Sequence, residues 1–153
     1  SVSAAVALLL LMLLLALAVV LALPQASRSL CLLLALAALP PVLLYPSAKR
    51  WFGYPQAVLA LCWGFAVLIP WAAATGGLSG GWPLGLCWAA TLLWTFGFDT
   101  VYAMADRPDD ARVGIRSSAL SLGPNAPGAV ALCYGATALL LAGAAAQAAA
   151  VAK

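Results

Sequence analysis

The stretch VSAAVALLLLMLLLALAVVLAL, residues 2–23, carries no charged side chain and no alternation of polar and apolar residues. A helix needs roughly 20 apolar residues to cross a hydrocarbon core of about 30 Å. The stretch is longer than the apolar core of a signal peptide and has no basic leader before it. We therefore expect residues 2–23 to form an internal transmembrane helix.

The rest of the chain has a similar composition. Of its 153 residues, 66% are hydrophobic and 7% are charged, whereas a soluble domain carries about 25% charged residues. Lipid cannot satisfy open backbone groups, and the apolar runs are too long and too free of alternation for a barrel. We therefore expect an all-α integral membrane protein in the lipid bilayer. The basic residues behind the net charge of +3 lie at the ends of loops, so we expect no nucleic-acid partner.

Five apolar runs have the length of a membrane span or approach it, and together they predict one helical domain over residues 1–153. The expected helices cover residues 2–23, 29–44, 55–74, 82–98 and 126–152. Pro40 and Pro41 should kink the second helix or end it early, and Pro70 should kink the third, because proline removes a helical hydrogen bond.

Most charged residues lie in the connections at 45–54 and 99–125, which fall on the same side of the membrane if all five helices cross it. The basic residues on that side are Lys49, Arg50, Arg107, Arg112 and Arg116. The opposite side has Arg28 and Lys153. Because basic residues are enriched in cytoplasmic loops, we expect both charged connections to face the cytoplasm.

All four acidic residues of the chain lie close together, between Asp99 and Asp110. On a single helix Asp99, Asp106 and Asp110 would fall within about 40° of one another, whereas Asp109 would point away. Carboxylates on one stripe repel each other unless a cation lies among them, and oxygen ligands suit Mg²⁺. Pro108 predicts that one helix ends near Asp106 and that a short second helix follows.

The basic residues beside these aspartates allow two interpretations. Arg107, Arg112 and Arg116 would pair with neighbouring aspartates in a solvated loop. Alternatively, they and Lys49 with Arg50 hold a polyanion, because guanidinium groups match the geometry of phosphate oxygens. Carboxylates for a metal, arginines for phosphate and lipid-lined helices together indicate a lipid diphosphate substrate. The residues alone leave both interpretations open.

Two stretches resemble the UbiA superfamily of intramembrane aromatic prenyltransferases. FDTVYAMADRPDDARVGIRSSAL, residues 98–120, is similar to the second Asp-rich motif of that superfamily. YPSAKRWFGYPQAVLALCWG, residues 45–64, is similar to its Tyr-x-x-x-Lys loop and the following helix. Within these stretches, the sequences DTVYAMADR and GIRSSA are most similar to the 4-hydroxybenzoate polyprenyltransferase branch. The resemblance extends over about residues 30–122.

The resemblance implies a nine-helix fold around a cavity open to the membrane, of which this chain would supply about five helices. Mg²⁺ and a prenyl diphosphate would be held on the cytoplasmic side. The implied catalytic and metal-binding residues are Asp99, Asp106 and Asp110. The implied substrate-binding residues are Tyr45, Lys49, Arg50, Arg112 and Arg116. Among these, Lys49 and Arg50 would contact the diphosphate, and Tyr45 would shape the cavity wall.

The reaction implied is the Mg-dependent transfer of a polyprenyl group from polyprenyl diphosphate to the ring of 4-hydroxybenzoate, in ubiquinone or plastoquinone biosynthesis. It would take place in the bacterial inner membrane, and no protein partner is expected. A dry, aromatic-lined pocket would keep water from the prenyl cation. Aromatic residues available for it are Trp63, Trp71, Trp88, Trp94 and Phe96. Aromatic residues of this kind also serve ordinary packing near membrane interfaces.

One part of the family pattern is missing. The first motif, Asn-Asp-x-x-Asp, has no counterpart in this sequence, whose single asparagine is Asn125. We therefore expect the chain to be part of a longer enzyme and these residues alone to be inactive.

Three other functions compete with this interpretation. Another branch of the superfamily would prenylate haem, chlorophyllide, homogentisate or a naphthoate. A CDP-alcohol phosphotransferase needs an Asp-Gly pair before Ala-Arg, but Asp110 is followed directly by Ala111 and Arg112, and no acidic residue follows. A non-enzymatic transporter or scaffold would leave its loop acids solvated. Charges in a transport path usually lie within the helices, whereas these acids lie at or beyond the expected helix ends.

Overall fold

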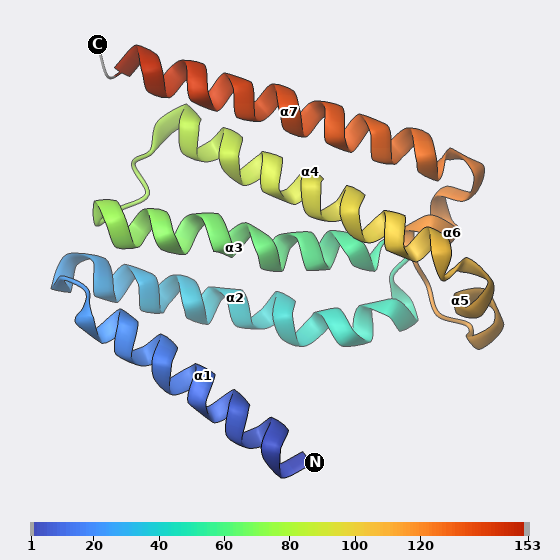
Figure 1. The fold of residues 1–153 in the computed structure, drawn as a ribbon, viewed down its shortest axis with the longest axis horizontal. Helices are drawn as coiled ribbons and strands as arrows, with labels where there is room; N and C mark the ends of the chain where they lie inside the picture. The colour runs from blue at the N-terminus through green and yellow to red at the C-terminus, as the bar shows by residue number, and fades with distance from the viewer. Residues whose placement is uncertain (1, 152–153) are drawn as a thin grey trace.

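The computed structural model describes residues 2–151 and is helical almost throughout (Figure 1). The long helices are α1 (Val2–Ala22), α2 (Gln25–Trp51), α3 (Pro55–Thr75), α4 (Gly81–Ala105) and α7 (Ala126–Val151). The connection from α4 to α7 contains α5 (Arg107–Val113), α6 (Ser118–Leu122) and the 3₁₀ helix η1 (Gly123–Asn125). Five helical segments are long and apolar enough to cross a membrane, which confirms the expected all-α membrane class. Ala152 and Lys153, used in the expectations above, lie outside the described residues.

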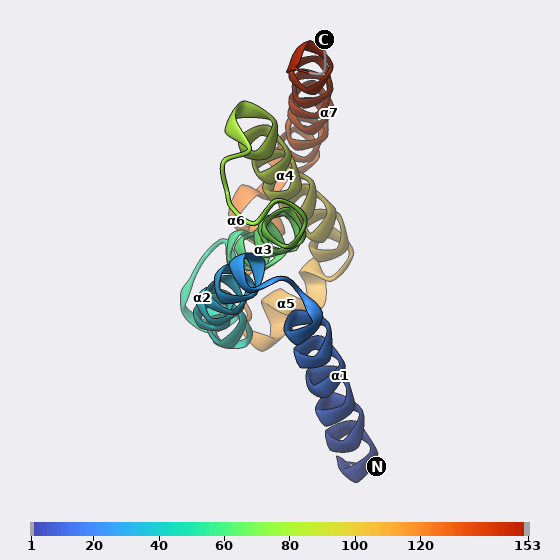
Figure 2. The same ribbon diagram turned by 90° about the vertical axis from the view of Figure 1, so that its left-hand side faces the viewer.

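The helices are arranged nearly in chain order. Helix α2 packs on α3, α3 on α4, and α4 on α7, and both views show these four lying side by side (Figures 1 and 2). Helix α1 contacts α2 and slants away from the others. The ends of α2 and α4 and the beginnings of α3 and α7 meet at one end of the bundle, beside α5 and α6 (Figure 1). That end carries the candidate site.

Glycines allow α4 to approach both of its neighbours closely. A Cβ added at Gly64 of α3 would lie 2.7 Å from Nε1 of Trp88, and one added at Gly97 of α4 would lie 3.1 Å from Cβ of Cys133. Membrane helices associate through small residues of this kind, because leucine packs no better against protein than against lipid tails. The position of α4 therefore depends on small side chains at its contacts.

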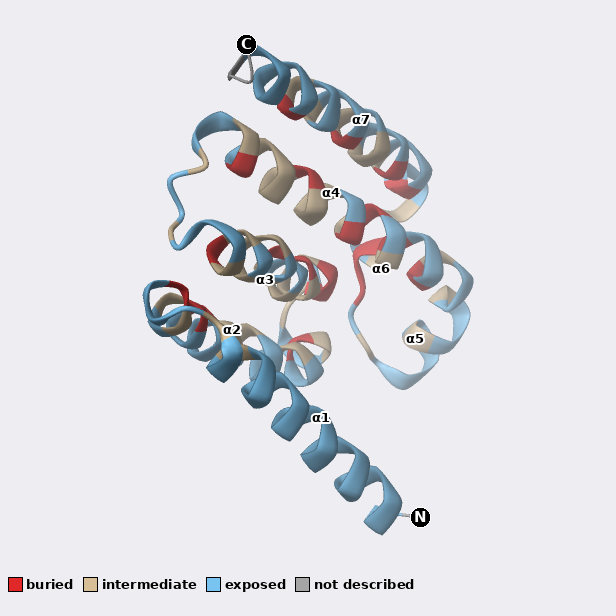
Figure 3. Ribbon diagram, turned by 60° about the vertical axis from the view of Figure 1, so that its left-hand side comes forward, coloured by how far each residue is buried: buried red, intermediate tan, exposed pale blue. Residues whose placement is uncertain are grey.

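Burial follows the pattern of a protein in lipid. Helix α1 has no buried residue within residues 2–22 (Figure 3), and many leucines on the described helices are exposed. The buried apolar positions are mostly alanines. Gln56 and Thr100 are the largest of the fully buried side chains described, at 2% and 0% exposed. The interior at the site end therefore contains polar side chains among small apolar ones, whereas residues such as glutamine are mostly exposed in soluble proteins.

The expected extent of the 45–54 loop is wrong. Helix α2 begins at Gln25 and runs through Pro40, Pro41 and Pro46 to Trp51, so the non-helical connection is limited to residues 52–54. Proline is tolerated inside membrane helices because neighbouring groups and local adjustments satisfy the freed backbone groups.

The expected start of the 99–125 loop is also wrong, because α4 continues through Asp99 to Ala105. The break expected near Asp106 is present: α4 ends at Ala105, and α5 begins at Arg107 with Pro108 in its first turn. Proline favours a first turn, where its missing N–H costs nothing. Gly114 then ends α5 with a φ of 71°, a left-handed conformation that glycine adopts without strain.

Candidate functional site

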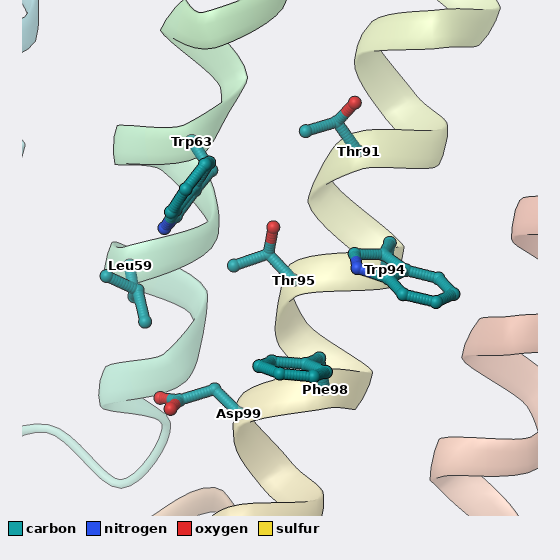
Figure 4. Close-up of a pocket in the computed structure, with 7 residues that line it drawn as sticks. All are labelled: Leu59, Trp63, Thr91, Trp94, Thr95, Phe98 and Asp99. Carbon is teal, nitrogen blue, oxygen red and sulfur yellow. The ribbon is translucent and has the colours of Figure 1, made fainter.

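Asp99 is the centre of the candidate site. It is partly buried on α4, and Figure 4 shows its carboxylate pointing from α4 towards α3. Lys49, Tyr45 and Asp106 lie near enough to Asp99 to interact with it electrostatically. Tyr45 and Lys49 are one turn apart on α2 and so share a face. The structure thus brings together four of the residues that the sequence singled out.

The three aspartates do not form a stripe on one helix. Asp99 belongs to α4, Asp106 lies at the junction, and Asp110 belongs to α5, so the helical-face argument for them was wrong. Within residues 2–151, no three Asp, Glu, His or Cys side chains converge as metal ligands. Mg²⁺ usually takes one or two carboxylates and completes its shell with water and phosphate. The oxygen-only donors of Asp99 and its neighbour Asp106 fit that requirement.

The arginines near the aspartates differ in their contacts. Arg112 donates to Asp109 at 2.9 Å, and both side chains are 76% exposed, so this pair contributes little to stability. The solvated-loop interpretation describes that pair correctly. Arg107 instead donates from Nη2 to the Gly123 carbonyl at 2.6 Å. Its guanidinium thus ties the start of α5 to η1.

Arg116 contacts the end of α2 rather than an aspartate. Its backbone N–H donates to the Lys49 carbonyl at 2.8 Å, and its Nη1 donates to the Trp51 carbonyl at 3.0 Å. The last carbonyls of a helix lack partners within the helix and carry partial negative charge. Arg116 therefore caps α2, a role the sequence did not reveal. Contact of Arg112 and Arg116 with a substrate stays a prediction.

Three buried polar residues near Asp99 were not assigned a role from the sequence. The Gln56 side-chain oxygen accepts a hydrogen bond from the Ser118 N–H at 2.8 Å. The Thr100 and Ser118 hydroxyls lie 2.7 Å apart, and Thr100 also donates to the Phe96 carbonyl at 2.6 Å. The available signal was Gln56 itself, a lone amide at the start of an apolar run. Serine and threonine give no comparable signal.

A pocket of about 270 Å³ lies between α3 and α4 next to Asp99. Its lining residues are Leu59, Trp63, Thr91, Trp94, Thr95, Phe98 and Asp99 (Figure 4). Of the aromatic residues named from the sequence, Trp63 and Trp94 belong to it. Trp71 lines a separate cavity, and Phe96 lines a third.

A row of aromatic rings continues from this pocket along α4. Trp94 stacks on Phe98 with ring centroids 6.4 Å apart, and Phe98 meets Tyr102 at 5.0 Å. Trp94 also contacts Tyr134 of α7 at 5.1 Å. The spacing of four residues places these α4 rings on one face. An aromatic surface therefore runs from the pocket towards the acidic end of α4.

The fold and this site define a multi-pass helical membrane protein with acidic, basic and aromatic groups gathered at one end of its bundle. Residues 1–152 match the UbiA prenyltransferase family. The chain belongs to that family.

Curated relatives carry specific names. The chain is 54% identical over 101 residues to a 4-hydroxybenzoate solanesyltransferase of Synechocystis sp., which covers 65% of this chain and 34% of that protein. It is 44% identical over 101 residues to a 4-hydroxybenzoate octaprenyltransferase of Neisseria meningitidis serogroup B, covering 65% and 33%. A third, from Dechloromonas aromatica, is a 4-hydroxybenzoate octaprenyltransferase at 40% identity over 111 residues, covering 69% and 36%. The chain thus spans about a third of the length of these relatives. No solved structure matches it significantly.

Proposed function

We propose that the protein transfers a polyprenyl group from polyprenyl diphosphate to the ring of 4-hydroxybenzoate in quinone biosynthesis. Family membership and the names of the relatives support this proposal. The observation that carries it is the place of Asp99 in the lining of an aromatic pocket, with Tyr45 and Lys49 near enough to interact with it electrostatically. Such a site combines groups for a metal diphosphate with an apolar space for a prenyl chain.

The charged residues bind the diphosphate end of the substrate. Lys49 and the exposed Arg50 lie at the end of α2, from which they reach the phosphate oxygens, and Tyr45 bounds the cavity. Asp99 and Asp106 would hold Mg²⁺, with Asp110 as a further ligand from α5, and the ion when bound would supply positive charge to the departing diphosphate. Arg112 and Arg116 add positive charge at the rim.

The pocket serves the apolar part of the reaction. The allylic C–O bond breaks and the diphosphate leaves with its electron pair. A ring carbon next to the 4-hydroxybenzoate hydroxyl then forms the new C–C bond and loses its proton. Trp63, Trp94 and Phe98 exclude water from the prenyl cation, and their ring faces stabilise its charge.

The site belongs at the cytoplasmic face of a bacterial inner membrane. Among the described residues, five basic residues on that side of the bundle, against Arg28 on the other, support this orientation under the positive-inside rule.

The test is made on the complete natural protein in membranes, supplied with polyprenyl diphosphate, Mg²⁺ and 4-hydroxybenzoate. Asp106→Asn and Asp110→Asn should each lower kcat/KM by about 100-fold, as for the loss of a charged transition-state contact. Asp109→Asn is the matched control, because Asp109 is exposed and paired with Arg112, and it should stay within about twofold of wild type. Wild-type rates for both Asp106→Asn and Asp110→Asn would refute the proposed site. Prenylation of homogentisate or a naphthoate in place of 4-hydroxybenzoate would refute the acceptor.

A further inference from the structure

Residues 116–121, which we call the clasp, connect the ends of three long helices. The segment follows α5 and includes most of the short helix α6. It hydrogen-bonds to the end of α2, to the α2–α3 connection, to the first turn of α3 and to α4. The partners on α2, on α3 and between them lie more than 60 residues from the clasp in sequence, and the partner on α4 lies 18 residues away.

The clasp holds the α2 side through main-chain carbonyls. Arg116 donates its backbone N–H to the Lys49 carbonyl and its Nη1 to the Trp51 carbonyl, at 2.8 and 3.0 Å. Ser121 donates its hydroxyl to the Gly53 carbonyl at 2.5 Å. The backbone of the Lys49 turn is therefore bonded directly to the clasp.

The clasp holds α3 and α4 through Ser118. Its N–H donates to Gln56 at 2.8 Å, and its hydroxyl lies 2.7 Å from that of Thr100. A hydroxyl has one proton, and Thr100 uses its proton to donate to the Phe96 carbonyl. Ser118 is accordingly the donor to Thr100. Ser118 thus joins the first turn of α3 to the residue that follows Asp99.

This network is closed to solvent. Thr100 and Ser118 are 0% exposed and Gln56 is 2% exposed. In a medium of low polarity such hydrogen bonds are strengthened, and a satisfied network favours one arrangement of its members. The backbone near Lys49 and the backbone near Asp99 are both attached to it. A shift in the clasp would change the position of one side chain relative to the other.

We propose that Thr100 and Ser118 are positioning residues that, through the clasp, set the placement of Lys49 relative to Asp99 for binding prenyl diphosphate. This inference rests on the proposed function. Neither hydroxyl contacts the substrate. Their effect passes through the ends of α2 and α4.

The test compares Thr100→Val with Thr100→Ser in the complete natural protein. Valine keeps the shape of threonine but removes the acceptor for Ser118, whereas serine keeps the hydroxyl and removes a methyl group. Thr100→Val should raise the KM for polyprenyl diphosphate by roughly tenfold, because displacement of a positioned group by less than 1 Å has effects of this order. The KM for 4-hydroxybenzoate should be unchanged, and Thr100→Ser should restore wild-type values. A lower kcat with both KM values unchanged would show a loss of folded protein and would overturn the inference.

Lys49→Met separates this inference from the proposed function. If Lys49 binds the diphosphate, Lys49→Met should impair the reaction, and Thr100→Val should add little in that background, because the two changes act through one group. Full activity of Lys49→Met would contradict the proposed site itself. If Lys49→Met lowers activity and Thr100→Val lowers it by the same factor in that background as in wild type, the positioning role alone would be contradicted.

Discussion

Replacing Gln56 by methionine should destabilise the protein measurably. The substitution keeps the length of the side chain but removes the oxygen that accepts the Ser118 N–H at 2.8 Å. Both residues are buried, so the N–H would stay unpaired at a cost of about 1–3 kcal/mol. Methionine buries apolar atoms in place of an amide, which offsets part of this cost. The cap from Ser117 to the Leu120 N–H would remain. We therefore expect a net loss of about 1–2 kcal/mol.

The measurement is reversible unfolding of the complete natural protein in mixed micelles, with tryptophan fluorescence as the probe. A loss of about 1.4 kcal/mol raises the unfolding constant tenfold. Gln147→Met is the matched control, because Gln147 is exposed on α7, and it should stay within about 0.5 kcal/mol of wild type. If Gln56→Met unfolds at the same midpoint as Gln147→Met, the buried hydrogen bond does not hold α6 to α3.

Three further predictions test other parts of the structure. Gly97→Val should lower the free energy of unfolding by about 1–3 kcal/mol in the same assay, because the valine side chain would meet α7. Gly135→Ala is its control: a Cβ there has open space, so this change should be neutral or stabilising. Arg116→Ala should lower the free energy of unfolding by about 0.3–1 kcal/mol through loss of a cation at a helix end, and retention of full stability would argue against capping. Cysteine labelling tests orientation: in intact cells an impermeant maleimide should modify Ser79→Cys and spare Asp109→Cys, and the opposite pattern would reverse the topology.

The membrane class and the number of long helices were predictable because apolar run length directly reflects bilayer thickness. The break near Asp106 was also predictable, since Pro108 disfavours a continuous helix. The extent of α2 was not, because proline rules reflect soluble helices, whereas Pro40 and Pro46 lie in a helix that crosses lipid.

The charged residues of the site were predictable from the sequence, but the hydrogen bonds that hold their helices in place were not. Tyr45 and Lys49 are spaced to share a helical face, and Asp99 stood out as an acid at the end of an apolar run. The bond from Gln56 to Ser118 joins residues separated by 62 positions, and no periodicity reports such a contact. For Arg116 the residues left phosphate binding and pairing with an aspartate open, and the family resemblance favoured the substrate. Two carbonyls at the end of α2 are equally suitable acceptors, and only the fold brings them within reach.

Because lipid surrounds the protein, buried hydrogen bonds have a larger part in fixing the helix ends at the site than apolar packing has. Burial of leucine gives no advantage over lipid, so the apolar surface of α1 and α2 does not determine where the helix ends lie. Directional contacts must do so, and in the described residues the fully buried large side chains at the site end include Gln56 and Thr100. Polar contacts of this kind fix distance and angle more narrowly than apolar packing against lipid. Substitutions that alter catalysis without touching substrate should therefore concentrate in the clasp and its partners, and those on the lipid-facing side of α1 should be tolerated.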